Sequence, residues 1–328
     1  MKRRSKVAIL LLITFISIET ALSASANIQE DEYTLIVDKT EGGTYTTIQE
    51  AINDAPEGST IYVKNGAYSE IIDIRKKISI IGENKDKTII NPISEKNKYA
   101  VRLGAPGVKI SCLSITNGAP GLYTNGIRIS ASETKIYNCN IYDTPVGIAI
   151  WTSYNIIQNC NFWGCSDEGI ALMGSPYSKC DNNRITNCLF FDNCDGIELQ
   201  YSSDNIIEDC EFYENTHAGI DAIASSNDRN MISNCKIYNN EVHGIYFSSS
   251  SENQIIDCLI SDNKDGDIIM NENSRYNEIK YNSEDLENEK ENDEQEYYLL
   301  ENYKNIISKF FNRLSKINIK EMIPFFAL

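Results

Sequence analysis

The chain is poor in histidine, in proline and in positive charge. Its 328 residues include 2 His and 7 Pro, and 30 Lys and Arg stand against 47 Asp and Glu, which gives a formal net charge of −17. So acidic a chain lacks the cations that neutralise phosphates, which argues against nucleic acid as a partner. Two His argue against a transition-metal site built from imidazoles. The hydrophobic share of 41% excludes disorder throughout and suits one large domain or two ordinary ones.

The first 26 residues have the pattern of an export signal. Basic residues at 2–6 precede an apolar run at 7–18 that is too short to span a bilayer, and the small residues 24–26 suit cleavage. We therefore expect a signal peptide over residues 1–26, with an uncleaved signal anchor as the alternative. No later run is long and apolar enough to cross a membrane. The pattern predicts a secreted protein, extracellular, periplasmic or held at the cell surface.

The rest of the chain is built on a repeat of about 22 residues. One column of the repeat is a Gly that usually precedes Ile: Gly126, Gly147, Gly169, Gly196, Gly219, Gly244 and Gly266. A second column is a Cys that follows a polar residue: Cys139, Cys160, Cys188, Cys210, Cys235 and Cys258. Each period holds three short segments of alternating apolar and polar residues, separated by Asn, Asp, Ser and Gly.

Alternation with period two indicates strands that bury one face. Three strands in every period, repeated along the chain, predict an all-β fold, a right-handed parallel β-helix. Asn suits the corners because it tolerates the left-handed backbone conformation. Residues 45–52 predict an amphipathic helix with a capping box from Thr46 to Gln49, which would close the N-terminal end of the stack. Strands are expected at 60–63, 72–74 and 78–80.

The chain divides into four expected parts. A single β-helix domain at 27–282 follows the signal and leads into an acidic linker at 283–296. Residues 297–328 have apolar positions at helical spacing and several Lys, which predicts a basic amphipathic C-terminal helix. This helix could dock on the solenoid, cover its last coil or lie on a membrane surface.

These segments resemble a known superfamily. The run from 43 to 92 has Tyr-Thr-Thr-Ile-Gln-Glu-Ala-Ile at 45–52, Ile-Tyr-Val-Lys-Asn-Gly-Ala-Tyr-Ser-Glu at 61–70 and Ile-Ile-Gly-Glu at 80–83. It is similar to the opening of pectin methylesterases, which belong to the pectin-lyase-like β-helix proteins. The later Asn-Cys and Gly-Ile repeats resemble those of NosD-type and carbohydrate-binding or sugar-hydrolase β-helix proteins. The resemblance covers roughly residues 33–282 and implies the fold.

The activities of these families are not carried over with the fold. The methylesterase segments, a Gln-Asp pair and an Asp-Phe-x-Phe-Gly loop, have no match in this chain. His243-Gly244 matches part of a polygalacturonase pattern, but the paired Asp and the Arg-x-Lys are not in place. A copper role of the NosD kind finds no His-rich or Met-rich run.

Stacked coils turn a column of the sequence into a row in space, with neighbours about 4.8 Å apart. The residues beside the Gly column are expected to face outward and to gather carboxylates on one side. The candidate catalytic residues are Glu198, Asp221, Asp195 and His243, with His217 nearby. The carboxylates that could hold Ca²⁺ are Glu168, Asp195, Glu198 and Asp221. No cofactor is required by these patterns, and Ca²⁺ is the ion that they could take.

Glu198 and Asp221 are expected on adjacent coils. Carboxyl groups about 5 Å apart could act as acid and nucleophile in a retaining glycosidase. A β-elimination would instead use Ca²⁺ on the carboxylates with Arg128 or a His as base. The alternative is that these positions are only the solvated charges of an acidic protein.

A second outward column is aromatic and contains Tyr142, Trp163, Phe191, Tyr213 and Tyr238. Exposed aromatic rings can pack against sugars, unless another part of the chain covers them. The candidate substrate-binding residues are Trp151, Tyr246, Arg128, Tyr142, Trp163, Tyr213 and Tyr238.

The Cys column is expected to point inward as reduced, packed thiols, because parallel Cβ vectors would strain disulfides between coils. Cys165 and Cys194 are the better disulfide candidates.

Two functions remain open on the sequence alone. One is binding or processing of a polysaccharide on a face of the solenoid, by a lyase or hydrolase if the protein is an enzyme. The other is a non-enzymatic interaction module, such as a NosD-like periplasmic accessory protein.

Overall fold

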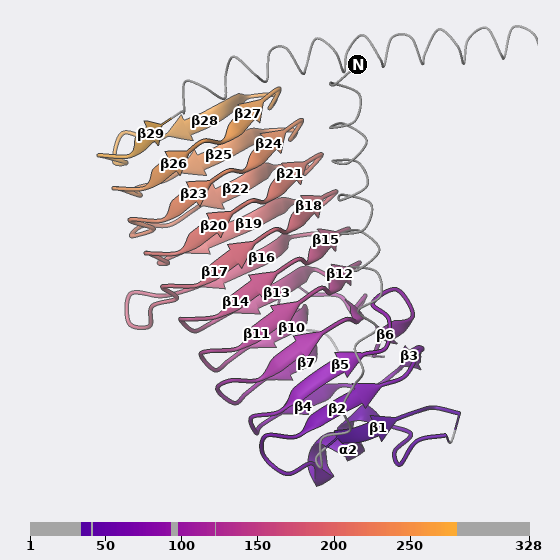
Figure 1. Ribbon diagram of the computed structural model, residues 1–328. Coiled ribbons are helices and arrows are strands. Elements are labelled where there is room, and N and C mark those ends of the chain that lie inside the picture. The colour runs from indigo at the N-terminus through magenta and orange to yellow at the C-terminus, as the bar shows by residue number, and fades with distance from the viewer. Residues whose placement is uncertain (1–33, 41, 93–97, 122, 281–328) are drawn as a thin grey trace, which may run out of the picture.

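Short strands of three to six residues wind the chain into a stack of coils (Figure 1). The computed structural model describes residues 34–40, 42–92, 98–121 and 123–280. Each full coil contributes one strand to each of three sheets, and one of the sheets has a further strand at either end. The strands within every sheet pair in parallel. This is the predicted all-β parallel β-helix.

Sheet A has eleven strands: β1 (Thr34–Val37), β2 (Thr60–Val63), β5 (Ser79–Gly82), β8 (Lys109–Ser111), β11 (Lys135–Tyr137), β14 (Ile156–Gln158), β17 (Arg184–Thr186), β20 (Ile206–Glu208), β23 (Met231–Ser233), β26 (Gln254–Ile256) and β29 (Glu278–Lys280). Sheet B has nine: β3 (Gly66–Tyr68), β6 (Thr88–Ile90), β9 (Ser114–Thr116), β12 (Asn140–Tyr142), β15 (Asn161–Trp163), β18 (Leu189–Phe191), β21 (Glu211–Tyr213), β24 (Lys236–Tyr238) and β27 (Leu259–Ser261). Sheet C also has nine: β4 (Ile72–Ile74), β7 (Tyr99–Leu103), β10 (Asn125–Ile129), β13 (Val146–Ile150), β16 (Glu168–Met173), β19 (Asp195–Gln200), β22 (Ala218–Ala222), β25 (His243–Phe247) and β28 (Gly266–Met270).

The corner between sheets A and B explains the Cys column. A left-handed Asn or Asp precedes each of these Cys residues, as at Asn159 with φ 54° and Asn187 with φ 51°. The Cys then points inward, and its thiol donates to the carbonyl two residues earlier, 3.3 Å away at both Cys160 and Cys188. A small apolar side chain fits inside so tight a turn. All ten cysteines are free thiols, including Cys165 and Cys194, so a disulfide between those two is wrong.

Two ladders of asparagines, buried at every member except the half-buried Asn277, hold the other corners. Between sheets C and A, the Nδ2 of Asn205 donates to Oδ1 of Asn230 at 3.0 Å, and the backbone N–H of Asn205 donates to the same atom. The bond repeats from coil to coil through Asn155, Asn183, Asn205, Asn230, Asn253 and Asn277. Between sheets B and C, a second ladder joins Asn193, Asn215, Asn240 and Asn263. Each amide thereby satisfies polar groups that would otherwise be buried without partners.

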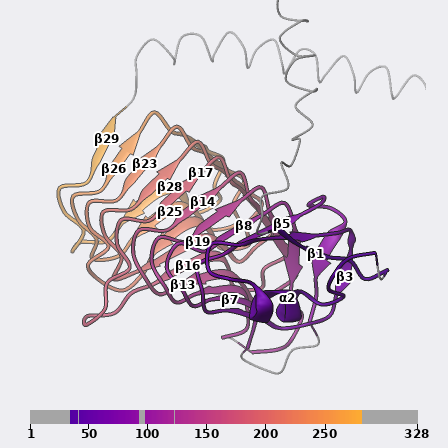
Figure 2. The same ribbon diagram turned by 60° about the horizontal axis from the view of Figure 1, so that its bottom comes forward.

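One helix lies at the N-terminal end of the stack, as Figures 1 and 2 show: α2 (Ile48–Asp54). It buries Ile48, Ala51 and Ile52. The predicted capping box is displaced by one residue, because Thr47 is the N-cap and accepts from the N–H of Glu50. Glu70 explains why the helix begins one residue later than predicted. Its carboxylate accepts from the N–H groups of Ile48 and Gln49 and so fixes the first turn at these residues.

The signal peptide, the acidic linker and the C-terminal helix predicted from the sequence lie outside the described residues. No helix within the described ranges combines the length and the hydrophobicity that crossing a bilayer demands.

Candidate functional site

The outer surface of sheet C carries the predicted acidic row, defined as Glu168, Asp195, Glu198 and Asp221. Register confirms that they are coil neighbours: Glu168 pairs with Asp195, and Glu198 pairs with Asp221. All four are at most 9% exposed. They are therefore not the solvent-exposed charges of the alternative interpretation.

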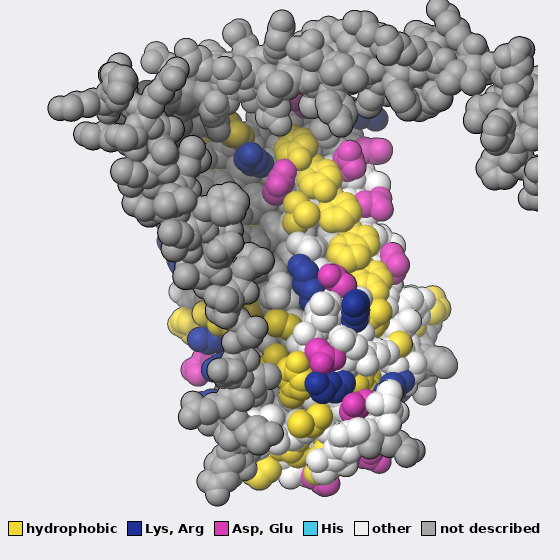
Figure 3. Space-filling model, turned by 45° about the vertical axis from the view of Figure 1, so that its right-hand side comes forward, with side chains coloured by type: hydrophobic (Ala, Val, Ile, Leu, Met, Phe, Trp, Pro, Cys, Tyr) yellow, Lys and Arg dark blue, Asp and Glu magenta, His cyan; other side chains and the backbone are white. Residues whose placement is uncertain are grey.

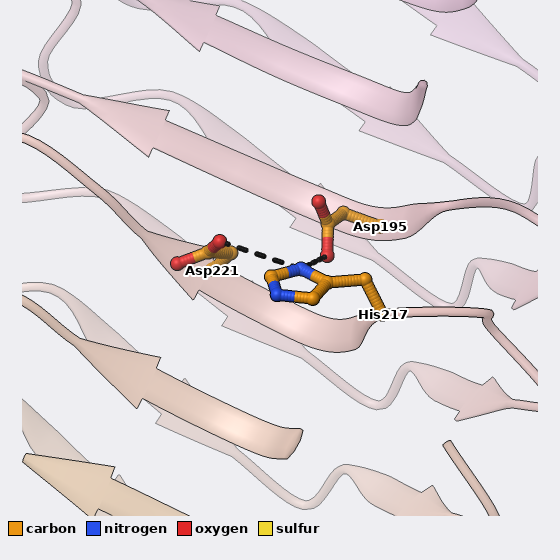
Figure 4. A group of neighbouring side chains, drawn as sticks. All are labelled: Asp195, His217 and Asp221. Atoms are coloured by element: carbon orange, nitrogen blue, oxygen red, sulfur yellow. Dashed lines mark hydrogen bonds and ion pairs between the residues drawn. The ribbon is translucent and has the colours of Figure 1, made fainter. Parts of the chain in front are cut away.

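The closest group in the row is formed with His217, which lies just before β22 (Figure 4). Its Nδ1 is 2.8 Å from Oδ1 of Asp195 and 3.6 Å from Oδ2 of Asp221. Asp195 also accepts from the N–H of Ala218 at 2.8 Å, which fixes the carboxylate against the next coil. The His217 side chain is 39% exposed, whereas those of Asp195 and Asp221 are 7% and 5% exposed. The imidazole is thus the most exposed side chain of the group, and the two carboxyl groups are nearly covered.

Burial changes the acidity of these carboxyl groups. Desolvation, reinforced by Asp195 and opposed by His217, raises the pKa of Asp221 to about 7. Desolvation also raises the pKa of Asp195, although the contact with His217 opposes it. Oδ1 of Asp221 is buried and has no hydrogen-bond partner among the described residues. A buried, unpartnered carboxyl oxygen costs free energy, so it marks a position where a proton or an external ligand belongs.

A second carboxyl pair lies one step away in the row. Desolvation, with the charges of Glu198 and Asp167, raises the pKa of Glu168 to about 9. Desolvation raises the pKa of Glu198 as well, and the amide of Gln200, which donates to its Oε1 at 2.5 Å, opposes that shift. Around neutral pH, Glu168 is therefore a carboxylic acid rather than a carboxylate.

The structure separates the predicted catalytic residues into a core and its neighbours. Asp195 and Asp221 meet at His217, while Glu198 lies beside Glu168. His243 is one coil further on, with its ring centroid 6.1 Å from that of His217 and 5.4 Å from that of Tyr246. Burial and the proximity of His217 lower the pKa of His243.

From the sequence, His217 is expected only to lie near the candidate catalytic residues, although in the structure it contacts both Asp195 and Asp221. Its position one coil after Asp195 and four residues before Asp221 is the signal that would have found it.

Arg128 and Trp151 lie on the N-terminal side of the row. The Arg128 side chain folds back onto its own coil, where Nε donates to Oδ1 of Asn125 and Nη2 donates to the carbonyl of Tyr123. Between Arg128 and Glu198 the same outward column contains Ala149 and Ala171, which pack with Val146 and Met173 as a small apolar cluster. Trp151 follows β13 and is 40% exposed.

The aromatic ladder, defined as Tyr142, Trp163, Phe191, Tyr213 and Tyr238, lies on sheet B, on a different face from the acidic row. Figure 3 shows hydrophobic side chains in a column along this face. Neighbouring rings are 4.6 to 5.8 Å apart and within 11° of parallel, so each covers the face of the next. The ladder therefore presents ring edges and hydroxyl groups outward, and only its two end rings keep a face for a sugar.

A cation could be held by the same group of three side chains. Among the described residues, Asp195, His217 and Asp221 are the one group of at least three His, Cys, Asp or Glu side chains whose ligand atoms all lie within 4.8 Å of one another. Glu168 and Glu198, predicted as further Ca²⁺ ligands, lie outside that group. One imidazole and two carboxylates suit Cu²⁺ or Zn²⁺ better than Ca²⁺, which takes six to eight oxygen ligands. Cu⁺ prefers thiolates and thioethers, which the group does not contain.

Known proteins resemble this chain in two overlapping segments. A family model described as "Periplasmic copper-binding protein (NosD)" matches residues 107–311, and one described as "Pectinesterase" matches residues 34–167. The curated protein Probable pectinesterase 56 of Arabidopsis thaliana is 27% identical over 167 residues, which are 46% of this chain and 58% of that protein. The chain thus spans less than two thirds of the length of such relatives.

Solved structures share the fold at low identity. The enzymatically active domain of tailspike protein 2 of bacteriophage CBA120 has a TM-score of 0.56 and 12% identity, covering 70% of this chain and 39% of that one. The mannuronan C-5 epimerase AlgE4 A-module of Azotobacter vinelandii has a TM-score of 0.51 and 13% identity, covering 68% of this chain and 87% of that one.

Proposed function

We propose that this chain, which belongs to the family of the periplasmic copper-binding protein NosD and has the pectin-lyase-like β-helix fold, acts on a polysaccharide. The proposed activity is binding and cleavage of that polysaccharide, in the periplasm or outside the cell. The observation that carries the proposal is the contact of His217 with two buried aspartates on the outer face of sheet C. The expected signal peptide, the periplasmic family and the pectinesterase relatives support the location.

The geometry suits a pair of proton transfers. Asp195 accepts the Nδ1–H of His217 and orients the ring, which leaves Nε2 as the general base. Asp221 holds a proton up to about pH 7 and is the general acid that protonates the leaving glycosidic oxygen. Nε2 would take a proton from water in a hydrolysis, or from a sugar carbon in a β-elimination.

Substitution of the group tests this role. His217→Asn and Asp221→Asn should each lower kcat about 100- to 10,000-fold on the polysaccharide that the protein cleaves, with little change in KM. Activity of the wild type should fall above about pH 7, as Asp221 loses its proton. His243→Asn is the matched control, because His243 lies outside the group. Product analysis separates the two reactions, since only β-elimination leaves an unsaturated sugar. Wild-type rates in both His217→Asn and Asp221→Asn would refute the proposal.

A second candidate function is cation binding at the same group, favoured by the unpartnered Oδ1 of Asp221. Titration calorimetry with Ca²⁺, Cu²⁺ and Zn²⁺ decides it. Binding of Cu²⁺ or Zn²⁺ that Asp221→Asn weakens, and that Asp204→Asn in the turn between β19 and β20 leaves intact, would support this candidate. Binding that EDTA removes without loss of cleavage would separate it from the enzymatic proposal.

A further inference from the structure

A pocket opens beside the acidic row, where three successive loops enter sheet C. It has a volume of about 530 Å³ and is lined by residues 118–121, 143–145, 164 and 166–167. Ligand pockets in proteins commonly measure about 300 to 1,000 Å³. The pocket is formed by the loops that lead into β10, β13 and β16, so it spans three coils.

The pocket lies one coil before the catalytic candidates. Asp167 lines it, and the carbonyl of Asp167 accepts from the N–H of Asp195 at 3.1 Å. A ligand in the pocket would therefore be next to the coil that carries Asp195. Because Glu168 directly follows Asp167, the pocket also borders the acidic row.

The pocket is lined by small, largely apolar residues and by acidic and hydroxyl side chains. Gly118, Ala119, Pro120, Pro145 and Gly164 provide small, largely apolar walls. The polar side chains among the lining residues are those of Asp143, Asp167, Ser166 and Thr144, and the buried Thr144 hydroxyl donates to the carbonyl of Val146. No Lys or Arg is among the lining residues. Carboxylates accept strong hydrogen bonds from hydroxyl groups and repel anions.

The backbone holds Asp143 in place for this role. Asp143 has φ 48° and Gly164 on the next coil has φ 65°. A Cβ on Gly164 would come within 2.6 Å of Oδ1 of Asp143. Gly164 therefore leaves room for the Asp143 carboxyl, which lies directly against it.

We propose that this pocket is a subsite for an uncharged, hydroxyl-rich sugar residue of the chain that the protein cleaves. The inference rests on the proposed function and sharpens it. β-Elimination needs a carboxylate beside the carbon that loses its proton, whereas hydrolysis does not. Where the residue at the cleaved bond is uncharged as well, the reaction is a hydrolysis: the bond from the anomeric carbon to the bridging oxygen breaks, and water supplies a hydroxyl to that carbon. His217 takes the other proton of the water, and Asp221 gives its proton to the leaving oxygen.

Binding measured without turnover tests the subsite. The probes are cellohexaose, mannohexaose and xylohexaose as uncharged chains and hexagalacturonate as the anionic chain, titrated into the full-length His217→Asn protein. We expect an uncharged chain to bind at least about 10-fold more tightly than hexagalacturonate. Ser166→Phe, which fills the pocket from an exposed position, and Asp143→Asn should each weaken binding about 10-fold or more.

The control is Ser178→Phe in the exposed hairpin that follows β16, which should bind like the parent. Asp143→Asn keeps the left-handed backbone, since Asn also tolerates it, so one pocket variant survives if Ser166→Phe does not fold. Tighter binding of hexagalacturonate would overturn the ligand class, and unchanged binding in both pocket variants would overturn the site. Pocket-dependent binding without any cleavage by the wild type would instead refute the catalytic proposal alone. Cleavage that needs His217 but ignores the pocket variants would refute only the subsite.

Discussion

At the scale of single residues, burial of outward-facing carboxyls is the main property of this surface. Glu168 faces outward from sheet C and yet is only 6% exposed. Desolvation together with Glu198 and Asp167 raises its pKa to about 9. An acid that stays protonated at neutral pH avoids the cost of a buried charge, and this cost returns when the pH rises.

The stability of the protein should therefore fall as the solution becomes alkaline. The folded chain holds the Glu168 proton up to about pH 9, while the unfolded chain releases it near the ordinary value of 4.5. The folded state thus binds more protons between these values, and the free energy of unfolding decreases through that window as pH rises. Glu168→Gln keeps the shape and removes the titration. It should raise the free energy of unfolding by about 1–3 kcal/mol at pH 9 and have little effect at pH 4.

Urea unfolding of the two proteins at pH 4, 7 and 9 measures this difference. Glu57→Gln, at an exposed loop position, is the control and should show no such trend. A Glu168→Gln effect that is equal at all three values would show that folding does not shift the pKa of this carboxyl.

At the scale of elements, the corners rather than the strands distinguish this solenoid. Strands of three residues form few hydrogen bonds each, so the buried asparagines that link coil to coil carry much of the polar pairing. Each internal member of the ladder between sheets C and A both donates to the next coil and accepts from the previous one. Asn205, for example, accepts from the backbone N–H and the Nδ2 of Asn183 at 2.8 and 3.1 Å.

Removal of one internal ladder member should be costly. Asn205→Ala deletes the acceptor of two donors on Asn183 and the donor to Asn230, and all of these groups are buried. We expect a loss of about 2–4 kcal/mol in the free energy of unfolding, because unpaired buried polar groups keep their desolvation cost. Urea unfolding measures it, with Asn273→Ala at an exposed turn as the control. Equal stability of the two variants would mean that water replaces the ladder amide.

At the scale of the whole molecule, one continuous interior runs along the stack. The Cys column, the inward Ile residues and the Phe stack of Phe162, Phe190 and Phe212 belong to a single hydrophobic cluster. Desolvation raises the pKa of the buried Cys180 thiol to about 12 and that of the half-buried Cys194 to about 11. Thiols that are buried and protonated react slowly, because the thiolate is the nucleophile.

Thiol counting tests this arrangement. Eight of the ten cysteines are buried, and Cys112 and Cys194 are partly exposed. At pH 7.5 the folded protein should react quickly with a thiol reagent at no more than these two positions, and the unfolded protein should react at all ten without reductant. Fewer than ten thiols after unfolding would reveal disulfides and would contradict the free-thiol interior. The variant Cys112→Ser should remove one fast thiol and no others.

Much of the fold could be predicted because a repeat fixes its own register. The Gly and Cys columns placed the coils, the three strands of each coil and the inward thiols, and the structure confirms them. Close packing also explains why Gly occupies its column, since a Cβ on Gly196 would come within 2.6 Å of the Phe212 ring and 2.5 Å of a backbone oxygen. The same register put Glu198 opposite Asp221, and the structure confirms that pairing too.

The sequence by itself therefore determined the solenoid, its period and the side on which the carboxyls gather, since these follow from alternation and from residues that recur at a fixed interval. Only the tertiary structure decided which of those residues meet. The approach of His217 to Asp195 and Asp221, the burial of the acidic row, the ring-on-ring stacking of the aromatic ladder and the pocket beside Asp167 all depend on how side chains lean between coils. A one-dimensional repeat specifies the stacking of coils, but the distances across its surface are set by packing in three dimensions.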